Sequence, residues 1–339
     1  MIVKARRAGL RFGVIGLVFA LATPWAGADE QDLRTTQVLL EGPLFLSMAE
    51  VDAAFARLDA DRAAAKGAIP NAMTYFESGG AGFGQSERAG RIGSGGSATQ
   101  MRVGADREVR PGVVVGAMAS VGFGSLGSGD LGATALGRHA DFYAKFTEGA
   151  LFAKALVGAS QFGFNAIERG AAGPQCRADA SGLVARAAGQ IGGSTRIGGV
   201  TMTPTVTVTA LGDRLSGYSE RGANGARFAS RMGAATIGAV RLAGSRSVRI
   251  DPKHKLKIEA FVAAEEVVGF RASDLKATVA GERVRAVALG GAPTGRGLVG
   301  GLGLGTSLMD GVTLQVNYDY GRRDGVSTRT TRGRIGVSF

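Results

Sequence analysis

Histidine, the residue most often used as a general acid or base, occurs only twice among the 339 residues of this chain. If the chain around His139 is a β-strand, Asp141 lies on the same face, because residues two apart share a face. A histidine beside a carboxylate can transfer protons, but no serine stands in a recognisable nucleophile context. His254 lies between Lys253 and Lys255. We therefore interpret His139 and Asp141 as part of a polar network and expect no enzyme.

Two glycine-rich stretches imitate nucleotide-binding motifs. "GGAPTGRG" at 290–297 has the spacing of a phosphate loop, but Arg296 replaces its lysine and Gly297 its Ser/Thr. "GLGLG" at 301–305 continues a strand-like alternation, and no helix follows it as a dinucleotide fingerprint requires. No spacing of Cys, His, Asp or Glu suggests a metal site, and the single cysteine, Cys176, excludes an internal disulfide framework. We expect no cofactor, no metal and no catalytic residue.

Charge is the remaining chemical feature. Eight cations fall on the polar side of segments that alternate as strands do: Arg102, Lys145, Arg186, Arg231, Lys255, Lys257, Arg332 and Arg334. Few acids share these positions, chiefly Asp106, Asp141, Glu259 and Asp319. If these faces enclose an open channel, its cationic excess favours anions. The alternative is that the charges only solvate the interior.

The segments that carry these charges alternate with a period of two. "TMTPTVTVTA" at 201–210 places threonines on one face and Met202, Val206 and Val208 on the other. "VTLQVNYDY" at 312–320 alternates in the same way. One face is apolar and the other polar or tiny, and only 6% of the residues are aromatic, so neither face resembles half of a bulky soluble core. The pattern predicts an all-β transmembrane barrel with its apolar face toward lipid and its polar face toward a lumen.

About twelve antiparallel strands of spanning length can be placed. They lie near 72–84, 97–107, 111–123, 134–146, 149–164, 179–192, 198–212, 225–242, 254–268, 297–308, 312–321 and 329–339. Short connections at Pro111-Gly112, 147–149 and 309–311 alternate with long ones such as 124–137 and 269–296. Bacterial barrels have short periplasmic turns and long outer loops, so both barrel ends should face the periplasm.

The N-terminus has the features of a Sec-type signal peptide, which we assign to residues 1–28. A positive region precedes the apolar stretch "FGVIGLVFALAT", and "AGA" before Asp29 is a small-residue cleavage site. No other long apolar run follows, so we expect no transmembrane helix. The formal net charge of +12 could suggest nucleic acid, but export argues against that partner and favours lipopolysaccharide or anionic solutes.

Residues 29–71 form a short N-terminal segment in which one helix is predicted, at 44–69. Ser47 and Glu50 fit a capping box, and an apolar stripe follows from Met48 to Leu58. About twenty residues span roughly 30 Å, enough to cross a membrane inside a polar pore. The helix surface also carries acids suited to pairing with lumenal cations: Asp52, Asp59 and Asp61. We expect the helix inside the lumen; the alternative is a small periplasmic helix.

Residues 72–339 resemble the C-terminal β-domain of autotransporters. The resemblance rests on "MRVGADREVRPGVVVGAMASVGFG" and on the final block "LVGGLGLGTSLMDGVTLQVNYDYGRRDGVSTRTTRGRIGVSF", which ends in an aromatic residue. It implies a twelve-stranded barrel threaded by a helix. It also implies insertion by the barrel-assembly machinery, which reads the last strand, here Ile335, Val337 and Phe339.

One departure from the family concerns the passenger. The family carries a long secreted passenger before the barrel, whereas only residues 29–43 precede the predicted helix. We therefore expect a monomeric outer-membrane translocator without a large passenger, in contact with outer-membrane lipid and lipopolysaccharide. The alternative is a passive anion-favouring pore or a structural outer-membrane protein.

Overall fold

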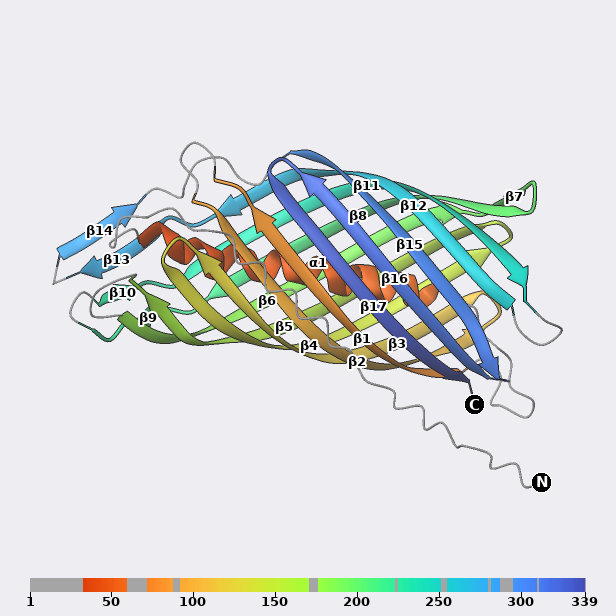
Figure 1. Cartoon of the computed structure of the whole chain (residues 1–339), viewed down its shortest axis with the longest axis horizontal. Coiled ribbons are helices and arrows are strands. Elements are labelled where there is room, and N and C mark those ends of the chain that lie inside the picture. Colours follow the sequence, from red (N-terminus) through yellow and green to blue (C-terminus); the bar gives the residue numbers. More distant parts are fainter. Residues whose placement is uncertain are drawn as a thin grey trace, which may run out of the picture.

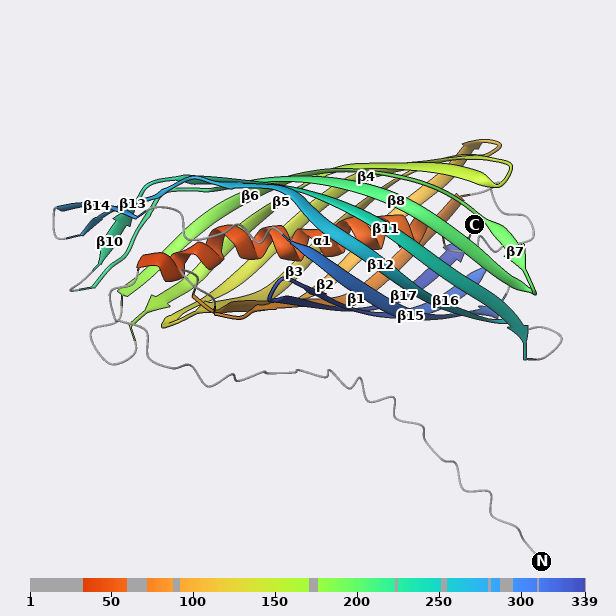
Figure 2. The ribbon, with the colours of Figure 1, turned by 90° about the horizontal axis from the view of Figure 1, so that it is seen from above.

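The computed structural model describes residues 33–59, 72–87, 92–170, 176–222, 225–250, 255–279, 282–286, 295–309 and 311–338. Within these ranges, twelve antiparallel strands close into a barrel around one helix (Figures 1 and 2). The barrel strands are β1 (Ala72–Gln85), β2 (Ser94–Arg110), β3 (Val113–Ser128), β4 (Leu131–Glu148), β5 (Leu151–Arg169), β6 (Cys176–Gly193), β8 (Val200–Leu215), β11 (Arg231–Arg249), β12 (Lys255–Ala272), β15 (Arg296–Met309), β16 (Val312–Arg323) and β17 (Val326–Ser338). The predicted fold class is confirmed.

The barrel closes by pairing its first and last strands. β1 lies antiparallel to β17 from Met73 opposite Ser338 to Gln85 opposite Val326. Every other barrel strand pairs with its sequence neighbours, and the short β7 (Thr195–Ile197) extends the sheet beside β8. Because Met73 also pairs with Asp106, the turn after β2 lies at the same end as the C-terminal strand end. Gly112 in that turn has a φ of +77°, which glycine adopts without strain.

One connection predicted to be long is instead a continuous hairpin. β3 continues to Ser128 and β4 begins at Leu131, so most of 124–137 is strand. Leu126 and Leu131 point inward and are buried in the barrel core. The glycine-rich sequence here therefore lengthens the sheet, because its alternate apolar side chains still pack in the interior of the barrel.

The alternation along the strands is as the sequence predicts. Val206 and Val208 of β8 are exposed on the outer surface, whereas Thr205 and Thr209 are buried. Apolar side chains are likewise exposed on the outside of other strands, for example Phe142 on β4, Leu302 on β15 and Tyr318 on β16. An exposed apolar surface of this extent is what a lipid-facing barrel presents. Among the described residues, no helix has the length and apolar character of a membrane span.

A second, four-stranded sheet stands at the end of the barrel opposite the C-terminus (Figure 1). Its strands are β14 (Glu282–Ala286), β13 (Leu275–Val279), β10 (Ala226–Phe228) and β9 (Tyr218–Ser219), in that order. Tyr218 and Phe228 stack with their ring centroids 4.6 Å apart and join the buried core with Leu275 and Ala277. The long connection predicted at 269–296 thus contains two strands of a small sheet.

The helix begins earlier than predicted. A 3-10 turn, η1 (Leu33–Gln37), leads into α1 (Val38–Leu58), and residues 60–69 of the predicted helix lie outside the described residues. Ser47 and Glu50 are buried inside α1, so the predicted capping box is wrong. Packing explains the early start, because the residues before Leu44 include Leu39 and Leu40, which are almost fully buried against the barrel wall.

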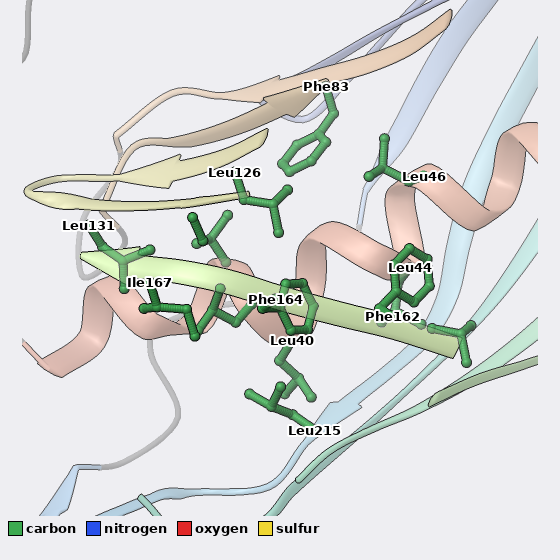
Figure 3. Packing of buried hydrophobic residues seen from close by; sticks show 14 of the residues in the cluster. Leu40, Leu44, Leu46, Phe83, Leu126, Leu131, Phe162, Phe164, Ile167 and Leu215 are labelled. Atoms are coloured by element: carbon green, nitrogen blue, oxygen red, sulfur yellow. The ribbon is translucent and has the colours of Figure 1, made fainter. Parts of the chain in front are cut away.

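α1 runs through the lumen, with its first turn near the four-stranded sheet and its last turn near the C-terminal end (Figures 1 and 2). Figure 3 shows the apolar half of this packing, in which Leu40 and Leu44 lie among Leu126, Phe162 and Phe164 from the barrel wall. A second cluster at the other half of the helix centres on Phe55. The expectation that the helix occupies the lumen is confirmed.

Candidate functional site

The middle of α1 is joined to the barrel by a buried network of charges. Arg102 on β2 donates from Nε to Glu50 Oε2 at 2.9 Å and from Nη1 to Glu77 Oε1 at 2.7 Å. Arg334 on β17 donates to the other oxygen of Glu77 at 2.6 Å and to the helix carbonyl of Ala53 at 3.1 Å. Two arginines from two strands thus share one strand carboxylate while each holds the helix.

A second contact lies one turn further along the helix. Arg57 of α1 reaches Asp106 on β2, with Nη2 2.7 Å from Oδ2 and both side chains almost fully buried. Its guanidinium also stands 5.0 Å from the centroid of the Tyr75 ring. The Tyr75 hydroxyl lies 3.1 Å from that of Tyr143. The ion pair is therefore closed off by aromatic rings, which exclude water and strengthen the electrostatic attraction.

Two lysines hold the C-terminal end of the helix. Lys145 on β4 donates to the Leu58 carbonyl at 3.0 Å, and Lys154 on β5 donates to the Phe55 carbonyl at 3.3 Å. Both also pair with Asp59, at 3.2 and 2.5 Å. The last carbonyls of a helix lack partners within it and carry partial negative charge. The barrel wall thus supplies the cap that the helix sequence lacks.

The 3-10 turn η1, which leads into α1, is held at the opposite end of the barrel. Arg231, at the start of β11, donates from Nη2 to the Thr36 carbonyl at 3.0 Å and from Nη1 to Gln37 Oε1 at 3.4 Å. Arg231 is almost fully buried. The helix is consequently fixed at both ends and in its middle.

The histidine that the sequence singles out does meet a serine. His139 Nδ1 lies 2.6 Å from Ser160 Oγ, directly across the β4–β5 pairing. Asp141, however, binds Arg186 through both of its oxygens, at 2.6 and 2.7 Å, and Arg186 also donates to Ser160. The carboxylate therefore does not orient the imidazole, and all four side chains are buried. The arrangement is a structural polar network, as expected for His139 and Asp141.

The structure separates the predicted lumenal cations into two groups. Arg102, Arg186, Arg231, Arg332 and Arg334 are buried inside the barrel. Arg332 pairs with Asp319, which the sequence places on the same polar side. Lys145 and Lys257 are partly exposed, and Lys255 at the start of β12 is exposed at the barrel rim.

The three acids predicted for the helix differ in their surroundings. Asp59 is held by two lysines, whereas Asp52 is exposed within the lumen and makes no ion pair among the described residues. Asp61 lies outside the described residues, as does Phe339 of the predicted assembly signal. Ile335 and Val337 lie on β17, where Ile335 is 44% exposed on the outer surface.

Sequence reasoning missed four of the charged residues that hold the helix. Glu77 lies on β1 and Lys154 on β5, whereas Glu50 and Arg57 lie on the helix itself. The inward parity of Glu77 and Lys154 could have identified them, because each stands two residues from an inward aromatic side chain, Tyr75 and Phe152 respectively. The partner of Glu50 depends on the position of the helix along the barrel, which local sequence does not encode.

The comparison with known proteins agrees with the observed fold. The family described as "Autotransporter beta-domain" matches residues 76–319. Among solved structures, the chain is similar to the translocator domain of autotransporter NalP from Neisseria meningitidis, with a TM-score of 0.71 and 15% identity over 89% of this chain and 99% of that one. It is also similar to the β-domain of the Bordetella autotransporter BrkA, with a TM-score of 0.61 and 17% identity over 79% and 100%. No curated protein matches.

Proposed function

Because the chain belongs to the family of autotransporter β-domains, outer-membrane translocators rather than enzymes, we propose that it holds its own N-terminal segment at the outer face of the outer membrane. One observation carries the proposal: a helix fills the lumen, with its first turn beside the four-stranded sheet and its last turn at the end where the C-terminal strand ends. A chain threaded in this direction leads from the outer side, through the barrel, to the start of β1.

The orientation follows from the connections. The turns after β2 and β4 are short and lie at the C-terminal end of the barrel, and that end faces the periplasm in bacterial barrels. The end with the four-stranded sheet then faces outward. Residues that precede Leu33 would emerge there, and a segment fused to them would be presented on the cell surface.

An open anion-favouring pore fits the contacts less well. Its selectivity would require free lumenal cations, but Arg102 and Arg334 are engaged by α1 and Glu77, and Arg231 is engaged by η1. All three arginines are also almost completely buried, so with the helix in place they present no charge to an aqueous channel. The helix is therefore the resting occupant of the lumen.

Export and assembly complete the proposal. A Sec-type signal peptide at residues 1–28 would carry the chain to the periplasm, and the barrel-assembly machinery would recognise the last strand. The apolar outer surface would contact lipid and, in the outer leaflet, lipopolysaccharide. The chain would act as a monomer, since the twelve-stranded sheet closes on itself and leaves no barrel edge to pair with a second copy.

The test is surface display. An epitope followed by a protease site is inserted after Gln31 of the full chain, and intact cells are stained and then treated with protease. We expect staining and its loss on proteolysis. The matched control carries the same insertion at Gly149, in the turn between β4 and β5, and should stain only after permeabilisation. If the insertion after Gln31 also requires permeabilisation while the barrel is folded, the proposal is wrong.

A further inference from the structure

The four-stranded sheet continues one part of the barrel wall. β9 follows β8, β10 precedes β11 and β13 follows β12, each after a break of two residues. One face of this sheet is buried, and its side chains, among them Phe228 and Leu275, join the same core as Leu215 of the barrel and Leu40 of α1. The opposite face is therefore a continuation of the outer surface of the barrel, beyond the β8–β11–β12 wall (Figure 1).

That outer face carries three cations. Arg227 on β10, Lys276 on β13 and Arg283 on β14 are exposed. The first two lie between buried neighbours along their strands, so their side chains point away from the core. The other positions on this face of β9 and β13 are Ser219 and Thr278, which carry no charge. None of the three cations makes an ion pair within the part of the chain that the structure describes.

The register of the sheet brings the three cations together. Arg227 lies opposite Thr278, and Thr278 lies opposite Arg283 on its other side. The two arginines thus stand in one row, about 10 Å apart, with a short side chain between them. Lys276 lies two residues along β13 on the same face. Side chains of this length reach across such a distance, so the three charged groups can converge on one anion, and guanidinium groups bind phosphate through paired hydrogen bonds.

Two further cations stand where the small sheet meets the barrel. Arg214 of β8 lies opposite Met232 of β11, and Arg271 of β12 lies opposite Ala234 of β11. Met232 and Ala234 are exposed on the outer surface, so Arg214 and Arg271, which are also exposed, share that face. Neither arginine makes an ion pair with another described residue. We call these five residues the cationic face: Arg214, Arg227, Arg271, Lys276 and Arg283.

Apolar side chains border the cationic face on its barrel side. Leu183 of β6 and Met232 of β11 flank Arg214 on either side, and both are exposed. Val208 of β8 and Val240 of β11 continue the apolar surface toward the other end of the barrel. A ligand that covers both regions carries anionic groups at one end and hydrocarbon at the other.

The cationic face has no counterpart on β1 and β3, which lie on the far side of the barrel. β3 contains no charged residue, and the one charged residue of β1, Glu77, is buried in the lumen. On β5 and β6, Glu168 and Arg177 neutralise each other in an ion pair of 3.1 Å. The cationic face is therefore a local feature of the surface and does not follow from the net charge of the chain alone.

We propose that the cationic face binds the phosphate groups of a lipopolysaccharide molecule, whose acyl chains lie on the apolar surface beside Leu183 and Met232. The inference rests on the proposed function, which places this end of the barrel at the outer face of the membrane. Cations close to an anionic lipid surface strengthen binding, and arginine adds a fork of donors that matches phosphate. Inorganic phosphate offers the same anion but no hydrocarbon for the apolar border, so the lipid is the ligand that uses both regions.

The experiment measures lipid binding to the purified full chain in detergent by native mass spectrometry. The probe is lipopolysaccharide that lacks its polysaccharide chain, and divalent cations are left out because they also bind phosphate. The test variant combines Arg227→Gln, Lys276→Gln and Arg283→Gln. Its affinity for the lipid should fall about a hundredfold, since each cation close to an anionic lipid surface contributes about a factor of five.

The matched control variant removes the same charge from the other end of the barrel. It combines Arg196→Gln on β7 with Arg246→Gln and Arg249→Gln on β11, all three at exposed positions. Its affinity for the lipid should equal that of the wild type. Both variants are first shown to be folded by heat-modifiable migration on gels.

Two further arms identify the ligand. Lipopolysaccharide from which the phosphates have been removed should bind the wild type as weakly as it binds the test variant, and excess inorganic phosphate should not displace the intact lipid. Four results would each overturn the proposal: no binding to the folded wild type, equal affinities of the test and control variants, undiminished binding of the dephosphorylated lipid, or displacement by inorganic phosphate. Binding in detergent does not depend on which side of a membrane the sheet faces, so this inference and surface display can fail separately.

Discussion

Glu50 on α1 and Arg102 on β2 meet inside the lumen, joined by two hydrogen bonds of 2.9 and 3.2 Å between the carboxylate and the guanidinium. Both side chains are almost completely withdrawn from water. The pair fixes the depth of the helix, because a shift of one turn would move Glu50 by about 5.4 Å and separate the charges. Removing one partner of a buried ion pair lowers the stability of the fold, since the other partner remains buried and charged.

Glu50→Gln should therefore destabilise the folded protein. We expect a loss of up to about 3–5 kcal/mol in the free energy of unfolding, because Arg102 keeps only Glu77 as a charged partner. The measurement is the urea dependence of heat-modifiable migration. The control is Glu168→Gln, whose pair with Arg177 is largely exposed, and it should cost about 0–1 kcal/mol. Equal effects of the two substitutions would contradict the anchoring role.

Removing the helix should open the barrel to anions. A chain lacking residues 33–59 loses Glu50, Asp52 and Asp59, while Arg102, Arg231 and Arg334 remain in the wall. Single-channel conductance should rise, and selectivity should shift toward anions as the exposed guanidinium groups dominate the lumen. Planar-bilayer recordings of the deleted and full chains check this. Unchanged conductance, with both chains folded, would mean that the helix does not occupy the lumen.

Thiol labelling should separate the two faces of the helix. With Cys176 first replaced by serine, Ala54→Cys should resist both small and bulky thiol reagents in the native barrel, because Ala54 is completely buried. Asp52→Cys should react with a small reagent, because Asp52 is exposed within the lumen. Both should react after unfolding. Free labelling of Ala54→Cys by a bulky reagent in the folded protein would contradict the packing of α1.

The strands were predictable because alternation is a local property. Each inward residue of β8 or β16 is followed by an outward one, and membrane lipid permits only apolar side chains on the outer face. The small outer sheet was not predictable, since β13 and β14 are five residues each and β13 pairs with β10, which precedes it by two barrel strands in the sequence.

The helix shows the same division between local and long-range information. Its existence follows from an apolar stripe, whereas its start does not, because the pattern Ser47–Glu50 imitates a cap. Glu50 is instead committed to Arg102, 52 residues away, and Ser47 is buried in the barrel. Which strand faces which turn of the helix is a matter of tertiary register. For this reason the lumenal cations could be predicted as a set, but their individual partners could not.

The last strand should act as an assembly signal beyond its contribution to stability. Ile335 points outward from β17 opposite Phe76 of β1 and Leu314 of β16, so Ile335→Asp places a charge against lipid. Such a charge costs about 2–4 kcal/mol near the membrane midplane and less toward the rim. Leu304→Asp on the outer face of β15 carries a comparable cost without altering the terminal strand.

The two variants therefore distinguish recognition from energetics. Refolded into lipid vesicles, Ile335→Asp and Leu304→Asp should lose similar yields of folded barrel. In cells, Ile335→Asp should accumulate as exported but uninserted chain to a greater extent than Leu304→Asp, because the assembly machinery reads the strand that Ile335 and Val337 belong to. Deletion of Phe339, which lies outside the described residues, should give the same cellular defect with little effect on refolding. Equal insertion of all three variants in cells would show that the terminal strand is not read during assembly.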